Sequence, residues 1–423
     1  MTFFTALTTM TSSTFVATGT LDLPKIDPGT KGKIPLPTFA TSDSAGEIWM
    51  TITFRQKTAT PWAHAGFEVA WFQAHLPSSA SPASIPATIR TTANPVPNLH
   101  KTQYSYTITT PSSHLTISRS TGLLTHWTHN NRPILHQHPN SNNNLNAAAA
   151  EKPLLTLDFW RAPTDNDHRG PDSAYWKRFG LDTLTSSLRS LSVAEHADHI
   201  AITSHTYIAP SILAWGFHTT TVYRIFADGE VRVSVKIKPS GPGPRTLPHI
   251  GLFLRLDKTL DCAKWFGGGP GEAYSDKKAA QRAGIWTAGV DELYTQYEVP
   301  QENGNRMDTR WLEVRDQRWE GGVRVRLVQD DEATIAQVDK DEDMERQKEE
   351  EKPLLFQWQL SPYSAQALEA AKHPCDLEED EAMLLRLDVA MAGVGTGACG
   401  PAIGEAYEVR CEERVFEYSF VPL

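Results

Sequence analysis

Several segments of the chain alternate apolar and polar residues with a period of two. In residues 48–54, isoleucine, methionine or phenylalanine occupies every second position. The same alternation recurs in residues 231–238, 323–327 and 356–360, where apolar residues alternate with arginine, lysine, serine or glutamine. Because successive side chains of a strand point to opposite faces, each segment is predicted to be a strand with one buried face. Such strands are typical of antiparallel sheets.

Turn residues separate the predicted strands. A Ser-Thr-Gly triplet at 120–122 divides two apolar segments as a hairpin would, and the Asp-Gly pair at 228–229 is a strong hairpin signal. Helical signals are few. One helix is predicted over residues 172–179, ended by the glycine that follows, and another over 364–371, capped by its first residue, a serine. The fold class is therefore predicted to be all-β.

Composition divides the chain into two domains. Residues 77–98 are rich in proline, serine and alanine, which predicts a linker over 79–101. A small first domain at 15–78 precedes this linker, and a large second domain at 102–423 follows it. The threonine- and serine-rich residues 1–14 are predicted to be a disordered start.

The first domain looks incomplete. We expect about four strands in it, whereas an immunoglobulin-type sandwich has about seven. Residues 1–14 are not expected to supply the missing strands. The domain is therefore interpreted as truncated, or as completed by another chain.

Two insertions are expected inside the second domain. Residues 139–150 read as a low-complexity loop. Residues 330–352 hold 11 Asp/Glu and 4 Lys/Arg, so this acidic insertion accounts for most of the net charge of −10. Charge runs of this kind are usually solvated loops. The negative balance argues against nucleic acid as a partner, because such binding depends on basic residues.

Cysteine usage and apolar patterning indicate the compartment. The four cysteines have no CxxC spacing, so a structural zinc site is not expected, and so few thiols fit a reducing compartment. The first 19 residues contain no Lys or Arg, and no run of about 18 apolar residues occurs anywhere. We therefore expect a cytoplasmic protein without a membrane span.

The first cluster that could carry chemistry is residues 158–167. Here Arg161, Asp165, Asn166 and Asp167 lie close to two aromatic residues and a proline. Carboxylates and amides bind sugar hydroxyls and hard cations, which favours a sugar or metal site. The alternative is a buried turn whose polar side chains bond backbone amides and the arginine. The residues favour the buried turn but leave both interpretations open.

Two further clusters combine glycines with polar side chains. In residues 265–274, Glu272 is a possible catalytic acid, although a structural turn is favoured because no phosphate-loop pattern follows. The polar residues of 294–311 can bind hydroxyl groups or satisfy loop backbone, and neither use is preferred. The candidates in this third cluster are Glu302, Asn303 and Arg306.

The fourth cluster is the glycine-rich segment 393–401, which contains Cys399. A cysteine nucleophile needs a base within reach. The sequence places none beside Cys399, so a flexible loop is the favoured interpretation.

These clusters together resemble glycoside hydrolase family 2 β-galactosidases. The runs DFWRAPTDND, WFGGGPGEAYSD, PQENGNRMDTRWL and GVGTGACGP occur in that family's order. The match lies in the C-terminal region, which is a separate small chain in heterodimeric relatives. Upstream, GTLDLPKIDPGTKGKIPLP, GEIWMTITFRQ and WAHAGFEVAWFQAHLP look like the later part of the family's immunoglobulin-like domain.

This resemblance implies both a fold and a role. The fold would be a partial immunoglobulin-like sandwich followed by a large antiparallel super-sandwich of the galactose-mutarotase type. The last domain of the family covers one side of an active-site pocket in a barrel, and β-galactosides of the lactose type are the substrates. By this resemblance Cys399 is the residue expected to lie close to the sugar.

The resemblance also implies that the catalytic residues are elsewhere. Family members hydrolyse with retention, using two carboxyl groups about 5–5.5 Å apart. Both glutamates, and the ligands for magnesium and sodium, lie mainly on the barrel in the family, and no barrel motif occurs in this sequence. Asp165, Asp167, Glu272 and Glu302 do not match the catalytic acids. We therefore expect no catalytic residue, no metal site and no cofactor in this chain, and a barrel-bearing N-terminal β-galactosidase chain or region as its partner, within a possible oligomer.

Two other functions remain open at this stage. A free carbohydrate-binding protein would use the aromatic and amide loops without catalysis. An aldose epimerase-like enzyme would need a positioned acid and base, for which His249 is the nearest candidate. That last idea depends on fold analogy alone.

Overall fold

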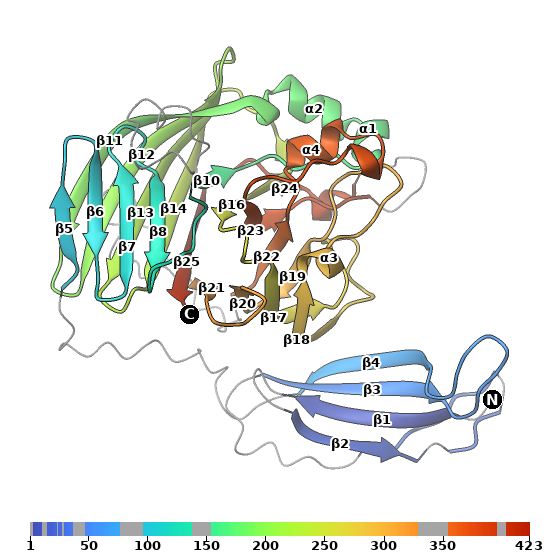
Figure 1. Cartoon of the computed structure of the whole chain (residues 1–423). Helices are drawn as coiled ribbons and strands as arrows, with labels where there is room; N and C mark the ends of the chain where they lie inside the picture. Colours follow the sequence, from blue (N-terminus) through green and yellow to red (C-terminus); the bar gives the residue numbers. More distant parts are fainter. Residues whose placement is uncertain are drawn as a thin grey trace, which may run out of the picture. The chain divides into compact units, whose positions relative to one another are not determined.

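The computed structural model describes nine ranges of the chain (Figure 1). They are residues 3–10, 15–22, 24–27, 29–36, 47–76, 96–137, 154–328, 354–395 and 403–423. The chain forms two compact units, the first built mainly from residues before 91 and the second mainly from residues after them. The predicted loop at 139–150, the acidic insertion at 330–352 and Cys399 lie outside the described residues.

The strands among the described residues of the first unit form an antiparallel sheet in the order β2-β1-β3-β4. Its strands are β1 (Phe3–Met10), β2 (Phe15–Leu21), β3 (Ile48–Gln56) and β4 (Glu68–Leu76). Met50 and Ile52 on β3 form its small core, as the alternation in this segment predicts, and Leu21, Phe54, Ala74 and Leu76 pack against them.

The prediction that residues 1–14 are disordered is wrong for residues 3–10. These residues form β1, an inner strand that pairs with β2 on one side and with β3 on the other. Threonine is a favourable strand residue where neighbouring strands flank it, so the threonine-rich composition is compatible with this position. The remaining residues of 1–14 lie outside the described ranges.

The second unit contains a nine-stranded antiparallel sheet in the order β11-β12-β13-β14-β25-β21-β20-β17-β18. The first half comprises β11 (Leu184–Glu195), β12 (His199–Pro210), β13 (Gly216–Phe226) and β14 (Val231–Ser240). The other half comprises β21 (Gly322–Val328), β20 (Trp311–Arg315), β17 (Cys262–Gly269) and β18 (Arg282–Gly289). The inner strand β25 (Arg414–Pro422) joins the halves by pairing with β14 and β21.

Three further sheets complete this unit. One has the order β10-β16-β23-β22-β19, with β10 (Leu155–Asp158), β16 (His249–Leu256), β23 (Met383–Met391), β22 (Phe356–Ser361) and β19 (Arg306–Thr309). Another runs from β5 to β9 in chain order, with β5 (Asn98–Lys101), β6 (Ser105–Thr109), β7 (Ser113–Ser118), β8 (Leu124–His129) and β9 (Arg132–Pro133). The short strands β15 (Thr246–Leu247) and β24 (Val409–Arg410) form the last pair.

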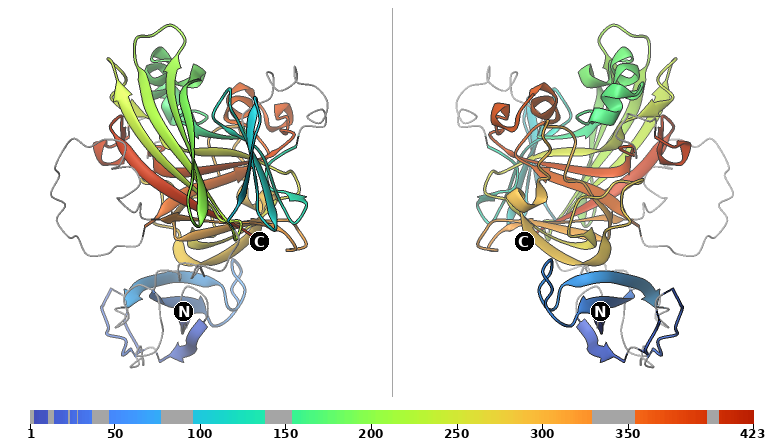
Figure 2. Two further views of the ribbon diagram at one scale, coloured as in Figure 1. Left: turned by 90° about the vertical axis from the view of Figure 1, so that its left-hand side faces the viewer. Right: turned by 90° about the vertical axis from the view of Figure 1, so that its right-hand side faces the viewer.

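The large sheets share one hydrophobic core, and Figure 2 shows β5–β8 facing the long strands β11–β14 across it. Val231, Val233, Val235 and Ile237 of β14 are at most 1% exposed, as the alternation predicts. Each such buried side chain contributes about 1.5–3 kcal/mol. The super-sandwich prediction is confirmed by these packed antiparallel sheets.

The linker prediction over 79–101 is wrong at its C-terminal end. Residues 98–101 form β5, which pairs with β6, and Leu99 packs against the core. The second unit thus starts before residue 102. The sequence did not predict β5, because a short polar strand with one apolar side chain has little alternation of apolar and polar residues. Residues 77–95 lie outside the described ranges.

The helices lie mainly at one end of the second unit (Figure 1). They are α1 (Asp165–Arg169), α2 (Asp172–Arg178), α3 (Val290–Leu293) and α4 (Ala365–Ala370), with 3₁₀ turns at Leu181–Thr183, Pro374–Asp376 and Glu405–Tyr407. Both predicted helices are confirmed as α2 and α4. Ser364 caps α4 by accepting a hydrogen bond from the backbone of Ala367, and Gly180 follows α2 with a φ of 69°. No helix among the described residues is long and apolar enough to cross a membrane.

Candidate functional site

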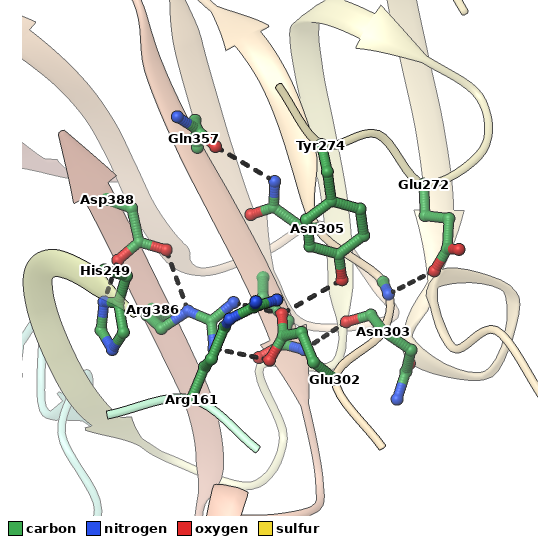
Figure 3. A network of polar contacts seen from close by, with 12 residues as sticks. Arg161, His249, Glu272, Tyr274, Glu302, Asn303, Asn305, Gln357, Arg386 and Asp388 are labelled. Carbon is green, nitrogen blue, oxygen red and sulfur yellow. Dashed lines mark hydrogen bonds and ion pairs between the residues drawn. The ribbon is translucent and has the colours of Figure 1, made fainter. Parts of the chain in front are cut away.

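A buried network of charged and polar side chains links three of the four clusters (Figure 3). Its centre is Arg386 on β23, which donates to both carboxylate oxygens of Glu302, from Nη1 at 3.0 Å and from Nη2 at 2.5 Å. Its Nε donates to Asp388 at 2.9 Å. These three side chains are at most 5% exposed. Burial opposes the charged form of Arg386, but Glu302 and Asp388 outweigh it and raise its pKa.

His249 extends this network on the neighbouring strand β16. Its Nδ1 lies 2.8 Å from Asp388 Oδ1, and its Nε2 lies 3.6 Å from Asp158 Oδ2 at the end of β10. The close pairing requires Gly251, because a Cβ there would lie 2.2 Å from Asp388 Oδ1. Burial lowers the pKa of His249, but Asp388 and Asp158 outweigh this effect and raise it to about 9. Asp388 and Asp158 thus favour the protonated form of His249, whereas the base of an epimerase must accept a proton.

Tyr274 joins the network from the second cluster. Its hydroxyl donates to Glu302 at 3.1 Å, and the side chain is 1% exposed. Burial and the neighbouring carboxylates Glu302 and Glu272 raise the pKa of Tyr274 well above its usual value. The phenol therefore serves as a hydrogen-bond donor at neutral pH.

Glu272 is held by three donors at the edge of the same region. It accepts hydrogen bonds from Lys277 at 2.5 Å, from the Tyr297 hydroxyl, and from the Gly304 backbone at 2.9 Å. Burial raises the pKa of Glu272, but these donors outweigh it and lower the pKa. A general acid of a glycosidase needs a raised pKa, so Glu272 is poorly suited to that role.

The third cluster supports its own loop between α3 and β19. Arg306 is 2% exposed and donates to the carbonyls of Leu293, Gly304 and Pro270 at 2.6–3.0 Å. Burial lowers its pKa to about 10. Asn303 donates to the Gln301 carbonyl at 2.9 Å and accepts from the Thr295 backbone at 3.2 Å. These contacts agree with the interpretation in which the polar side chains of this cluster satisfy loop backbone.

The first cluster forms a capped turn at α1. Asp167 accepts from Arg161 Nη2 at 3.1 Å and from the Thr164 backbone at 2.7 Å, while the Thr164 hydroxyl accepts from the Asp167 backbone. Both members of the Arg161–Asp167 pair are buried. Asp165 is exposed, and its backbone donates to Gln301 at 3.0 Å. The first cluster thereby contacts the third.

The first cluster and Asp276, which lies two residues after the second cluster, hold the start of the fourth. Arg161 donates to the Gly393 carbonyl at 3.0 Å, and Asn166 donates to the Val394 carbonyl at 3.0 Å. Asp276 accepts from the backbones of Val394 and Gly395, at 3.1 and 2.8 Å. Residues from three segments that are distant in sequence therefore meet at residues 393–395.

Sequence reasoning did not single out Arg386, Asp388 and Asp276. A signal exists for the first two, because an Arg and an Asp two residues apart interrupt the otherwise apolar strand MLLRLDVAM. Charges on the buried face of a strand need partners. Asp276 ends the run WFGGGPGEAYSD, but its spacing does not indicate its contacts with residues 394–395.

The predicted carboxylates are already occupied by protein partners. Asp167, Glu272 and Glu302 each accept at least two hydrogen bonds from other residues of the chain. Among the described residues, no group of three or more His, Cys, Asp or Glu has a metal-binding arrangement. These three carboxylates thus hold neighbouring side chains and loop backbone in place.

The spaces beside the network are small. A pocket of about 20 Å³ is lined in part by Asp158, Glu302 and Arg386. It has room for about one water molecule, whereas small-molecule pockets measure about 300–1,000 Å³. A larger cleft of about 580 Å³ lies among residues 129–134, 257–261 and 316–322, and no predicted site residue lines it.

The fold and the site define an all-β module with a buried ionic network at its centre. A family model described as "Beta galactosidase small chain" matches residues 109–421, and one described as "Beta-galactosidase, domain 4" matches residues 4–77. The chain belongs to the β-galactosidase small-chain family, as the motifs predict.

The relatives are longer proteins. A Kluyveromyces lactis β-galactosidase is 26% identical over 94% of this chain and 33% of its own length. A Vibrio cholerae β-galactosidase is 30% identical over 79% of this chain and 28% of its own length. The chain thus spans about a third or less of these relatives.

Solved structures of low sequence identity are also similar. A galactose 1-epimerase from Lactobacillus acidophilus has a TM-score of 0.40 and 8% identity, covering 77% of this chain and 98% of its own. An aldose epimerase homologue from C. elegans has a TM-score of 0.40 and 8% identity, covering 77% and 99%.

Proposed function

We propose that this chain acts as the C-terminal part of a β-galactosidase, closing one side of an active-site pocket in a barrel that the chain does not contain. The complete enzyme would hydrolyse terminal β-D-galactosyl residues of lactose-type substrates. The barrel region would hold the catalytic glutamates, with magnesium and sodium. The match to the small-chain family over residues 109–421 carries this proposal.

The occupied carboxylates support the inactivity of the chain alone. Retaining hydrolysis needs two carboxyl groups about 5–5.5 Å apart with room for a sugar between them. Glu272 and Glu302 instead bond Lys277 and Arg386, and the pocket beside Glu302 has a volume of about 20 Å³.

The state of the thiols supports a cytoplasmic location. Cys262, Cys375 and Cys411, the cysteines among the described residues, are free. Free thiols fit a reducing compartment.

The test is hydrolysis of nitrophenyl-β-galactoside by the purified chain, alone and mixed with a barrel-bearing N-terminal region from the same source. We expect no turnover by either component alone and turnover on mixing. Turnover by the chain alone would refute the assignment of catalysis to the barrel, and an inactive mixture would refute complementation.

Calorimetry with galactose and lactose on the chain alone distinguishes the carbohydrate-binding alternative. We expect no heat of binding at millimolar sugar, because the pocket beside the network holds about one water molecule and no predicted sugar-binding residue lines the larger cleft of about 580 Å³. Saturable binding would favour that alternative.

A further inference from the structure

Three side chains fix the backbone of residues 393–395 where β23 has ended. The carbonyls of Gly393 and Val394 accept from Arg161 and Asn166, each at 3.0 Å. The amides of Val394 and Gly395 donate to the two carboxylate oxygens of Asp276, at 3.1 and 2.8 Å. We call this set of contacts the 393–395 anchor.

The glycines of the anchor are required by close approach and by backbone conformation. A Cβ on Gly393 would lie 2.6 Å from Asp276 Oδ2, so any other residue would displace the carboxylate. Gly395 has a φ of +83°, which L-residues rarely adopt, and a Cβ there would lie 2.9 Å from Asn166 Nδ2. The absence of a side chain at these two positions therefore allows Asp276 and Asn166 to approach the backbone closely enough to bond it.

The anchoring side chains are themselves fixed. Arg161 is fully buried and paired with Asp167, which belongs to the capping box of α1. Asp276 lies in the turn between Tyr274 and Lys277, whose backbones bond each other, and the Tyr274 hydroxyl donates to the buried Glu302. Backbone N–H groups that donate to an ionised carboxylate form strong hydrogen bonds. The direction of the chain at Gly395 is thus set by the rigid interior of the second unit.

We infer that Asp276 is a positioning residue for the glycosidase reaction. It acts by fixing the backbone of residues 393–395, which directly precede in sequence the segment that contains Cys399. This role depends on the proposed function, in which Cys399 lies close to the substrate.

The experiment compares Asp276→Ala and Asp276→Asn in the chain mixed with the barrel-bearing region. The alanine removes both acceptors, and the asparagine keeps one acceptor but places an NH₂ group against the other amide. Misplacement of a substrate-contacting segment by about 1 Å can cost about 100-fold in rate. We expect kcat/KM to fall about 10- to 100-fold for alanine and less for asparagine, with a raised KM and an unchanged pH profile.

The matched control is Asp308→Asn, whose carboxylate is exposed and bonds Lys278 at 3.1 Å. Asp308 has a φ of 53°, which asparagine accepts. If alanine at 276 prevents folding, Asn166→Ala removes one anchor contact from the half-buried surface of α1 and tests the same claim. Thermal midpoints are measured for every variant.

The outcomes separate the inference from the proposed function. A fall in kcat/KM of the Asp276 variants, at midpoints equal to that of the control, supports the positioning role. Variants that match the control in KM and kcat, or that lose only thermal stability, overturn it while leaving the proposed function intact. An inactive mixture with the unmodified chain refutes the proposed function instead.

Discussion

Replacement of Arg386 by methionine tests the buried network most directly. The substitution keeps much of the side-chain volume but removes the guanidinium that donates three hydrogen bonds to Glu302 and Asp388. Both carboxylates then remain in the interior, at 1% and 0% exposure, without their main cation. Breaking a buried ion pair by removing one partner costs about 3–5 kcal/mol, because the remaining charge is uncompensated. We expect a loss of this size.

Urea unfolding followed by tryptophan fluorescence measures the loss. Urea is preferred over guanidinium because it leaves charge interactions unscreened. The buried Trp265 and Trp358 report on the second unit, and the midpoint should fall without a change in slope. The control is Lys101→Met, which removes an exposed pair with Glu195 at 3.1 Å and should cost ~0–1 kcal/mol.

A double variant separates charge from packing. Arg386→Met combined with Glu302→Gln should recover part of the loss, because one uncompensated carboxylate is removed as well. The reasoning would be refuted if Arg386→Met cost no more than Lys101→Met, or if the double variant lost the sum of the two single effects.

Three further predictions concern other parts of the site. The pKa of His249 is raised from its usual 6.5 to about 9. The contribution of its protonated form to stability is therefore complete below pH 6.5 and is lost as the pH rises through 9. Thermal midpoints measured from pH 6 to 10 should fall more for the unmodified chain than for His249→Gln. The pKa of Glu272 is lowered. Its ionised carboxylate therefore contributes to stability above the usual pKa of 4.5, and this contribution is lost as the pH falls below that value. Thermal midpoints measured from pH 6 to 3 should fall less for Glu272→Gln than for the unmodified chain, and equal falls would contradict this assignment. In the mixed enzyme, galactose should slow alkylation of Cys399, measured by mass spectrometry against Cys375 as an exposed internal control; equal rates with and without galactose would remove Cys399 from the sugar pocket.

Local patterns were sufficient to predict many elements of the fold. The alternation at 231–238 identified β14, and the serine at 364 identified the start of α4. Each of these signals is contained within a few neighbouring residues. The strands β1 and β5 were not predicted, because their stability comes from the strands beside them rather than from an apolar pattern of their own.

The candidate site was predictable only in part for the same physical reason. The polar clusters identified Glu302 and Arg161 as candidate site residues. They did not predict whether these side chains face solvent or the interior. That depends on partners remote in sequence, since Glu302 pairs with Arg386 84 residues later and Asp276 contacts Val394 118 residues later. The resemblance to a family rests on the order of the motifs along the sequence, whereas the contacts between the motifs become visible only in the folded chain.

The position of β25 has a consequence for biosynthesis. Residues 414–422 are the last of the nine strands to leave the ribosome, yet they lie between β14 and β21 and are paired with both. The two halves of the large sheet are therefore synthesised with unpaired inner edges that face each other, and exposed edges invite pairing with other chains. We therefore expect chains that lack Arg414–Pro422 to leave the edges of β14 and β21 unpaired and to aggregate more readily than the whole chain.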